Sequence, residues 1–103
     1  MTKPYAQILM ERNEEDLRSL LKETWGQRFI SQLLYDCGVY GSSVNFDNDR
    51  ITYFNEGRRS VGNALLEKVL RINPDAYRAM KRMDKEDYDV GQQDAERRRM
   101  ETA

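Results

Sequence analysis

The sequence predicts an all-α protein, a small bundle of about four helices with a packed aromatic loop and a charged C-terminal tail. The 103-residue chain contains only two prolines, which are rare inside helices because proline lacks the N–H donor. Apolar residues recur every three or four positions in four successive segments, which is the helical period. The connections between these segments are short, as between neighbouring helices of a bundle.

The first segment, residues 5–23, has apolar residues towards both of its ends and a polar stretch, "ERNEED", in the middle. Pro4 can stand at or near the first turn of a helix, where the missing N–H does no harm. Two interpretations remain open. One long helix is half exposed, or a short helix ends near Asn13 and a second one begins there, capped by Asn13 and Asp16.

The second segment, residues 24–38, gives the strongest helical pattern. Thr24 is a good N-cap, and Gly38 is a good helix stop at the C′ position. The apolar residues between them fall on one stripe at the helical period. These residues are Trp25, Phe29, Ile30, Leu33, Leu34 and Cys37.

The loop at residues 38–49 is rich in turn-forming residues, yet it contains the large apolar side chains Val39, Tyr40, Val44 and Phe46. A loop of this composition is expected to fold back onto the helices, or to offer those side chains to a partner. A short strand is the lesser alternative. Tyr40 and Phe46 are therefore candidate partner-binding residues.

The third helix is predicted from about Asp49 to Ile72, capped by Asn48 or Asp49. Asn73 caps the last helix, and Pro74 takes its first position. These helices complete a domain at residues 1–83. Residues 84–103 carry four basic and seven acidic side chains, so we expect a charged tail that is flexible or becomes helical on binding.

Two glycines, Gly57 and Gly62, lie within the predicted third helix, where each costs about 1 kcal/mol relative to alanine. Each lies one turn before an apolar residue, so both are predicted to be close-packing positions, like the helix stop Gly38. Side chains that could fill the space are Trp25, Phe29, Tyr40 and Phe46. Gly62→Leu is expected to unfold the domain and Gly62→Ala to be mild.

The residues that usually carry catalysis or hold metals are scarce. The chain has no histidine and one cysteine, Cys37, which lies on an apolar stripe. "GRRSVGNA" lacks the lysine and hydroxyl of a phosphate-binding loop, and "NFDND" lacks the glycine and glutamate of a calcium loop. We therefore expect no enzyme, no catalytic residue, no metal and no cofactor. With no apolar run of the roughly 18 residues that a membrane span needs and no signal-peptide pattern, we expect a soluble intracellular protein.

Charge is unevenly distributed, because the net charge is −1 while residues 51–83 carry seven basic and three acidic side chains. A basic face for an acidic protein or a nucleic-acid backbone could be formed by Arg58, Arg59, Lys68, Arg71, Arg78, Lys81 and Arg82. Among them, the candidate partner-binding residues are Arg58, Arg59, Arg71 and Arg78. The plainer interpretation places Arg58 at the border of the buried face in an ion pair, and Arg59 in solvent.

An ordered set of motifs spans residues 33–80. "CGVY" at 37–40 is followed by "SS", Phe54, "EGRR" at 56–59, "VG", "LL" and a "PxxYxxM" pattern that ends at Met80. This set resembles a family of small proteins from tailed bacteriophages and prophages, which is named after a late-region gene product of a Bordetella phage. The resemblance implies a phage protein encoded near the packaging, portal and capsid genes, with no enzymatic activity.

Three functions are consistent with these observations. The preferred one is a virion-associated or assembly protein that binds portal, capsid or ejected internal proteins, or further copies of itself, in the virion or the host bacterial cytoplasm. The second is a host-takeover factor that binds and inhibits a host protein. The third is a DNA-binding accessory protein that uses the basic face, although nucleic acid is the less favoured partner.

Overall fold

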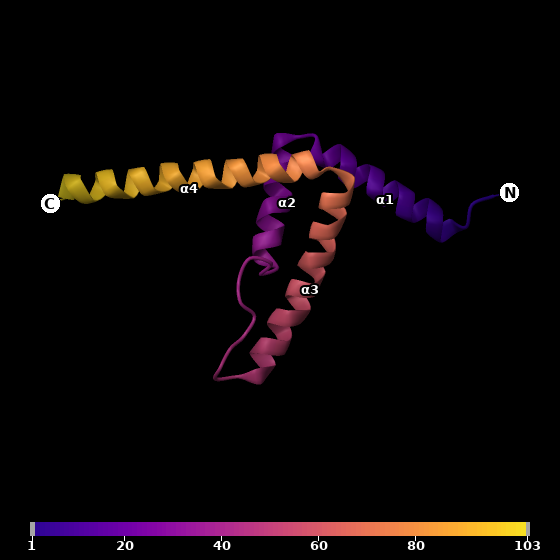
Figure 1. Cartoon of the computed structure of the whole chain (residues 1–103), viewed down its shortest axis with the longest axis horizontal. Helices are drawn as coiled ribbons and strands as arrows, with labels where there is room; N and C mark the ends of the chain where they lie inside the picture. Colours follow the sequence, from indigo (N-terminus) through magenta and orange to yellow (C-terminus); the bar gives the residue numbers. More distant parts are fainter. Residues whose placement is uncertain (1, 103) are drawn as a thin grey trace.

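The computed structural model describes residues 2–102 and consists of four helices, α1 (Tyr5–Leu21), α2 (Thr24–Asp36), α3 (Asp49–Ile72) and α4 (Pro74–Thr102). No strand occurs among these residues, so the all-α prediction is confirmed. Figure 1 shows α2 and α3 side by side as an antiparallel hairpin, with α1 and α4 extending in opposite directions from one end of it. α1 is one continuous helix, as in the first of the two interpretations left open.

The ends of α3 and α4 follow the predicted caps. The Asn48 side chain accepts the N–H of Arg50 at 2.9 Å, and the Asn73 side chain accepts the N–H of Ala76 at 3.0 Å. Pro74 is the first residue of α4. In each case a side-chain oxygen satisfies an N–H that has no partner within the helix.

Helix α2 ends as predicted but begins differently. Gly38 has a φ of 75°, its N–H donates to the Tyr35 carbonyl at 2.9 Å, and the next N–H, of Val39, donates to the Leu34 carbonyl at 3.3 Å. This pair of bonds is a Schellman motif. At the other end Glu23 is the capping residue, without a side-chain hydrogen bond, so the prediction that Thr24 caps the helix is wrong.

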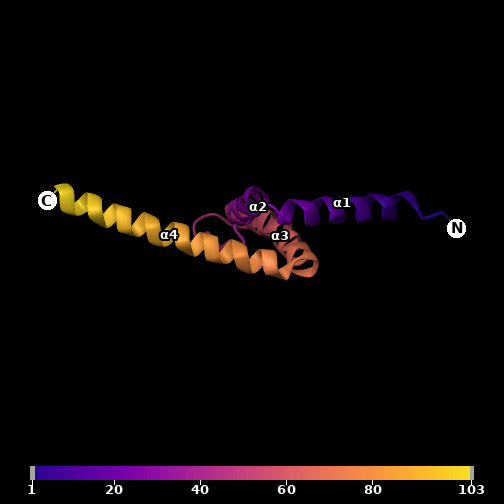
Figure 2. The same ribbon diagram turned by 90° about the horizontal axis from the view of Figure 1, so that it is seen from above.

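The hydrophobic core is small and lies where the four helices meet. Its buried apolar residues are Leu21, Ile30, Leu34, Val69, Ala76 and Met80. The radius of gyration is 18.4 Å, against about 13 Å for a compact domain of 100 residues. The molecule measures 73 × 38 × 16 Å, and the view from above in Figure 2 shows how thin it is. The shortest extent is little more than one helix diameter of about 10–12 Å.

Only part of the predicted α2 stripe faces this core. Ile30 and Leu34 are buried, but Trp25 and Phe29 are each 60% exposed. The reason is the direction from which α1 approaches α2. At Gly26, which the sequence did not single out, a Cβ atom would collide with the main-chain carbonyl of Leu20. The two helices therefore cross at this glycine, and Trp25 is left on the outer side.

The last helix is longer than the sequence suggests, because α4 continues to Thr102 where we expect a flexible tail from residue 84. Asp94 supports the helix here by forming ion pairs with two residues one turn further along, Arg97 at 2.6 Å and Arg98 at 3.1 Å. Such pairs stabilise isolated helices. We name residues 85–102 the C-terminal arm, none of which is buried.

The core contacts nevertheless stop near the predicted domain boundary. Met83 packs against the core, and the carboxylate of Asp84 accepts the hydroxyl of buried Ser31 at 2.9 and 3.0 Å. Asp87 still lines a shallow hollow with residues of α2, and beyond it the arm extends away from the other helices (Figures 1 and 2).

Removal of residues 89–103 is expected to change the free energy of unfolding by less than about 0.5 kcal/mol, as for surface changes that remove no packing. Urea denaturation followed by circular dichroism measures this directly. The far-ultraviolet helix signal should fall while the midpoint of the transition stays in place. A lowering of stability by more than about 1 kcal/mol would mean that the arm contributes to the folded domain.

Candidate interaction surface

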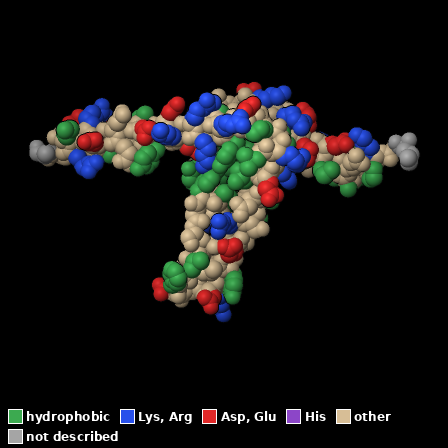
Figure 3. Space-filling view, in the orientation of Figure 1, with side chains coloured by type: hydrophobic (Ala, Val, Ile, Leu, Met, Phe, Trp, Pro, Cys, Tyr) green, Lys and Arg blue, Asp and Glu red, His purple; other side chains and the backbone are tan. Residues whose placement is uncertain are grey.

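The free end of the α2–α3 hairpin carries five exposed apolar side chains. We name this group the hairpin tip, and it consists of Val44, Phe46, Ile51, Tyr53 and Phe54. Phe46 is 96% exposed, Tyr53 73% and Phe54 69%. Figure 3 shows hydrophobic side chains gathered at this end of the hairpin. Grouped exposed apolar residues mark interaction sites more often than single ones do.

The backbone beneath the tip is held by a dense set of hydrogen bonds around Asn45. Its side-chain oxygen accepts the N–H groups of Asp47 at 2.9 Å and Asn48 at 3.1 Å. Its own N–H donates to the Thr52 hydroxyl oxygen at 2.8 Å, and that hydroxyl donates back to the Asn45 carbonyl at 3.2 Å. The loop is thereby joined to the first turn of α3.

A second set of contacts fixes the loop one turn further along α3. The Asn55 amide donates to the Ser43 carbonyl at 3.2 Å, and the buried Ser43 hydroxyl donates to the Glu56 carboxylate. Glu56 also lies 3.8 Å from the guanidinium of Arg59. The glutamate of "EGRR" therefore connects the serine pair of the loop to the helix.

The environments of the two arginines in "EGRR" are the reverse of the prediction. Arg58 is exposed, whereas Arg59 is half-buried. The Arg58 guanidinium donates to the Asn55 side-chain oxygen at 3.4 Å and lies 5.9 Å from the ring centroid of Phe54. Arg58 therefore borders the hairpin tip, while Arg59 belongs to the contact between loop and helix.

The two glycines of α3 also have different surroundings. A Cβ atom on Gly62 would lie 2.5 Å from both the Cβ of Cys37 and a methyl group of Val39. Gly62 is thus a close-packing position, although against the end of α2 and not against the aromatic rings we expected. Gly57 has nothing within 4 Å of its Cβ position, so the close-packing expectation does not hold there.

Tyr40 takes part in a partly exposed cluster of tyrosines and does not belong to the tip. Its ring centroid lies 4.8 Å from that of Tyr35, and its hydroxyl lies 3.2 Å from that of Tyr77. The Lys81 ammonium is 3.4 Å from the Tyr40 ring centroid, a cation–π contact. Burial raises the pKa of both Tyr40 and Tyr77. The cluster attaches the start of the loop to α4.

Two arginines of the predicted basic face form separate ion pairs within the chain. Arg71 of α3 pairs with Glu14 of α1 at 2.6 Å, and this hydrogen bond lowers the pKa of Glu14 and raises that of Arg71. Arg78 pairs with Asp75 on its own helix. Of the six candidate partner-binding residues, only Phe46 belongs to the hairpin tip, and Arg58 borders it.

The sequence did not single out Ile51 and Tyr53. The sequence feature that could have identified them is "ITYF", a cluster of large apolar residues in the first turns of a capped helix. From the sequence alone, this cluster is interpreted only as part of the helix. Within residues 2–102 no group of three or more His, Cys, Asp or Glu side chains could hold a metal ion. No helix in this range is long and apolar enough to cross a membrane.

Comparison with known proteins gives one family. The model of the Bbp19-like phage protein family matches residues 9–82, a range that includes the hairpin tip, the Gly62 contact and the tyrosine cluster. No curated protein and no solved structure gives a significant match. The C-terminal arm lies outside the matched range.

Proposed function

The chain belongs to the Bbp19-like phage protein family, and from this premise we propose that it is a non-enzymatic virion-associated or assembly protein. In this proposal it binds a phage structural protein, such as a portal, capsid or internal ejected protein, through the hairpin tip. It acts in the virion or in the host cell during assembly.

The observation that carries the proposal is a fixed loop backbone beneath exposed aromatic side chains. Five of the hydrogen bonds described above join residues 43–48 to α3, and two more, to the Asn45 side chain, lie within the loop. A binding element that is ordered before it meets its partner loses less conformational entropy on association. Phe46, Tyr53 and Phe54 supply the large rigid contact area typical of interface anchors.

The chemistry of the tip indicates the kind of partner surface. Its apolar side chains are bordered by Asp47, Asp49 and Arg50, which carry both signs of charge. A partner with an apolar cleft and a polar rim matches this arrangement, as in most specific protein interfaces.

The ion pairs of α3 and α4 weigh against the DNA-binding alternative. Nucleic-acid binding draws its affinity from basic side chains that neutralise phosphates. Here Arg71 and Arg78 face carboxylates of Glu14 and Asp75, and Lys81 lies among tyrosine rings. DNA would have to displace these partners.

The test is quantitative mass spectrometry of purified particles, together with the yield of infectious particles, from phage that carry wild-type or altered chains. We expect the protein at a fixed ratio to the portal subunit, and its loss from particles when Phe46 and Tyr53 are both changed to Ser. Tyr88→Ser is the control, because Tyr88 is an aromatic residue of similar exposure to Tyr53 on the C-terminal arm.

Each outcome has a distinct meaning. A protein that is absent from particles, and whose tip variant leaves the yield unchanged, would contradict the proposal and favour the host-takeover alternative. A pull-down from host lysate would then follow. If the tip variant enters particles as well as wild type does, the protein docks through another surface.

A further inference from the structure

The loop that carries Val44 and Phe46 covers its polar side chains and exposes its apolar ones. Ser43 is buried and Asn45 is half-buried, whereas Val44 is 54% exposed and Phe46 is 96% exposed. Alternation of this kind is typical of an extended segment, whose successive side chains point to opposite sides. In most proteins the apolar side is the covered one. Here the pattern is inverted, so hydrophobic burial contributes little to holding the loop in place.

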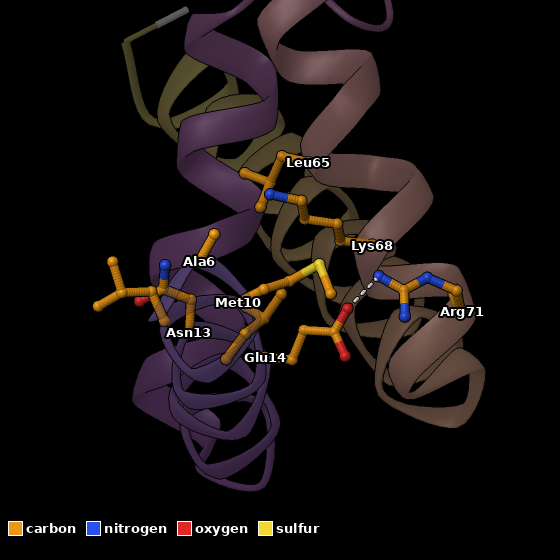
Figure 4. Close-up of a pocket in the computed structure, with 9 residues that line it drawn as sticks. Ala6, Met10, Asn13, Glu14, Leu65, Lys68 and Arg71 are labelled. Carbon is orange, nitrogen blue, oxygen red and sulfur yellow. Dashed lines mark hydrogen bonds and ion pairs between the residues drawn. The ribbon is translucent and has the colours of Figure 1, made fainter. Parts of the chain in front are cut away.

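The other end of α3 is packed in the usual way. Leu65 of α3 and Leu17 of α1 both pack against the hydrophobic core. Figure 4 shows the open groove between α1 and α3, where the Glu14–Arg71 ion pair lies beside apolar side chains such as Met10 and Leu65. Hydrophobic packing stabilises that contact, whereas the contact between the loop and the first turns of α3 depends on hydrogen bonds.

Residues 44–47 are joined to α3 at one place. The loop is bonded to α3 before this segment, through Ser43, and after it, through Asn48. Between these points the Thr52 hydroxyl accepts the N–H of Asn45 at 2.8 Å and donates to the Asn45 carbonyl at 3.2 Å. In the part of the chain that the structure describes, the other hydrogen bonds of this segment stay within the loop.

The two partners in this contact lie between the residues of the hairpin tip. Asn45 stands between the two tip residues of the loop, and Thr52 stands between Ile51 and Tyr53 of α3. The contact between Asn45 and Thr52 therefore sets how the apolar side chains of the loop lie relative to those of the helix. Thr52 is itself half-buried.

We propose that Thr52 is the positioning residue of the hairpin tip, with a hydroxyl that holds Phe46 in the place where it meets a partner. The consequence for binding rests on the proposed function, but the positioning is a property of the free protein. Without the hydroxyl, the loop keeps its bonds at Ser43 and Asn48, and the segment between them becomes mobile. Side chains that are mobile before binding lose more conformational entropy on association.

Amide hydrogen exchange of the full chain, followed by NMR, tests the positioning without a partner. Thr52→Val removes the hydroxyl and keeps nearly the same shape. We expect the amides of Asn45, Asp47 and Asn48 to exchange about tenfold faster in this variant, as for the loss of one or two hydrogen bonds. Circular dichroism should show an unchanged helix content and melting temperature, because the hydrophobic core lies at the other end of the hairpin.

Two further variants serve as controls. Thr52→Ser keeps the hydroxyl and should restore wild-type exchange, which separates the hydrogen bond from any other role of the side chain. Thr24→Val makes the same chemical change at an exposed threonine at the start of α2, where no side-chain hydrogen bond caps the helix. It should leave the exchange of the loop amides unchanged.

The effect on binding is measured by mass spectrometry of purified particles. We expect Thr52→Val to lower the amount of the protein relative to the portal subunit by about tenfold, because the mobile loop must be ordered on binding. Thr52→Ser and Thr24→Val should enter particles as the wild-type chain does.

Wild-type exchange in Thr52→Val would overturn the proposal. So would faster exchange with normal entry into particles, if the double variant of Phe46 and Tyr53 is lost from them. If that double variant enters particles normally, binding through the tip is wrong. The exchange rates of Thr52→Val and Thr52→Ser then decide by themselves whether Thr52 positions the loop.

Discussion

Gly62→Ala is expected to lower the free energy of unfolding by about 1–3 kcal/mol, the usual cost of overpacking a well-packed site. The added Cβ would lie 2.5 Å from the Cβ of Cys37 and from a methyl group of Val39. The Cys37 Cβ is bonded directly to the main chain and cannot rotate away. Alanine gains about 1 kcal/mol of helix propensity over glycine, which offsets only part of this cost.

Gly62→Leu should prevent the end of α2 from packing on α3 at all. The sequence alone suggests that Gly62→Ala is mild, and the distance to Cys37 is the reason for revising that expectation. Urea denaturation followed by circular dichroism gives the free energy of unfolding for both variants, and a wild-type value for Gly62→Ala would contradict the revision.

Gly57→Ala is the matched control on the same helix. Nothing lies within 4 Å of its Cβ position, and its φ is not positive. We expect it to stabilise the protein by about 0.5–1 kcal/mol through helix propensity alone. Similar midpoints for the two alanine variants would show that Gly62 is not a point of close approach.

Leu34→Ala should be among the most damaging of the conservative truncations, with a loss of about 2–5 kcal/mol. Leu34 is fully buried and lies in a core that has six buried apolar residues among residues 2–102. Because small domains are stable by about 5–15 kcal/mol in total, this loss removes a large share of the stability. No neighbouring layer can collapse into the cavity in so thin a molecule.

Thermal unfolding of Leu34→Ala beside Leu33→Ala checks this expectation. Leu33 is the adjacent residue of the same type, but it is 37% exposed. Its truncation should cost less than about 1 kcal/mol, because the lost side chain leaves no closed cavity. Equal melting temperatures for the two variants would show that the described core is not the one that stabilises the protein.

The sequence by itself determined the features that depend on neighbouring residues. The bounds of α3, the caps at Asn48 and Asn73, and the stop at Gly38 all follow from hydrogen bonds within a few residues. Pro74 marks the start of α4 for the same reason. The family resemblance was likewise carried by ordered local motifs, and the family model matches residues 9–82.

The candidate site was predicted only in part. Phe46 was identified because a large aromatic residue in a polar loop is unusual. Tyr53 was not, because a tyrosine in a helix is ordinarily explained by packing. Arg71 and Arg78 were grouped with the basic face because their carboxylate partners cannot be identified from spacing alone. The pairing of Arg71 with Glu14 joins residues 57 positions apart.

Only the tertiary structure decided which side of each helix is covered. Five residues separate Gly57 from Gly62, which is about 140° around a helix of 3.6 residues per turn. Periodicity places both near an apolar stripe, but the direction from which α2 approaches selects Gly62 alone. In the same way, the crossing of α1 over α2 at Gly26 leaves Phe29 exposed, whereas Ile30 is buried. Helical phase is a local property of the chain, whereas the approach of a second helix depends on all the contacts between them, and these lie far apart in the sequence.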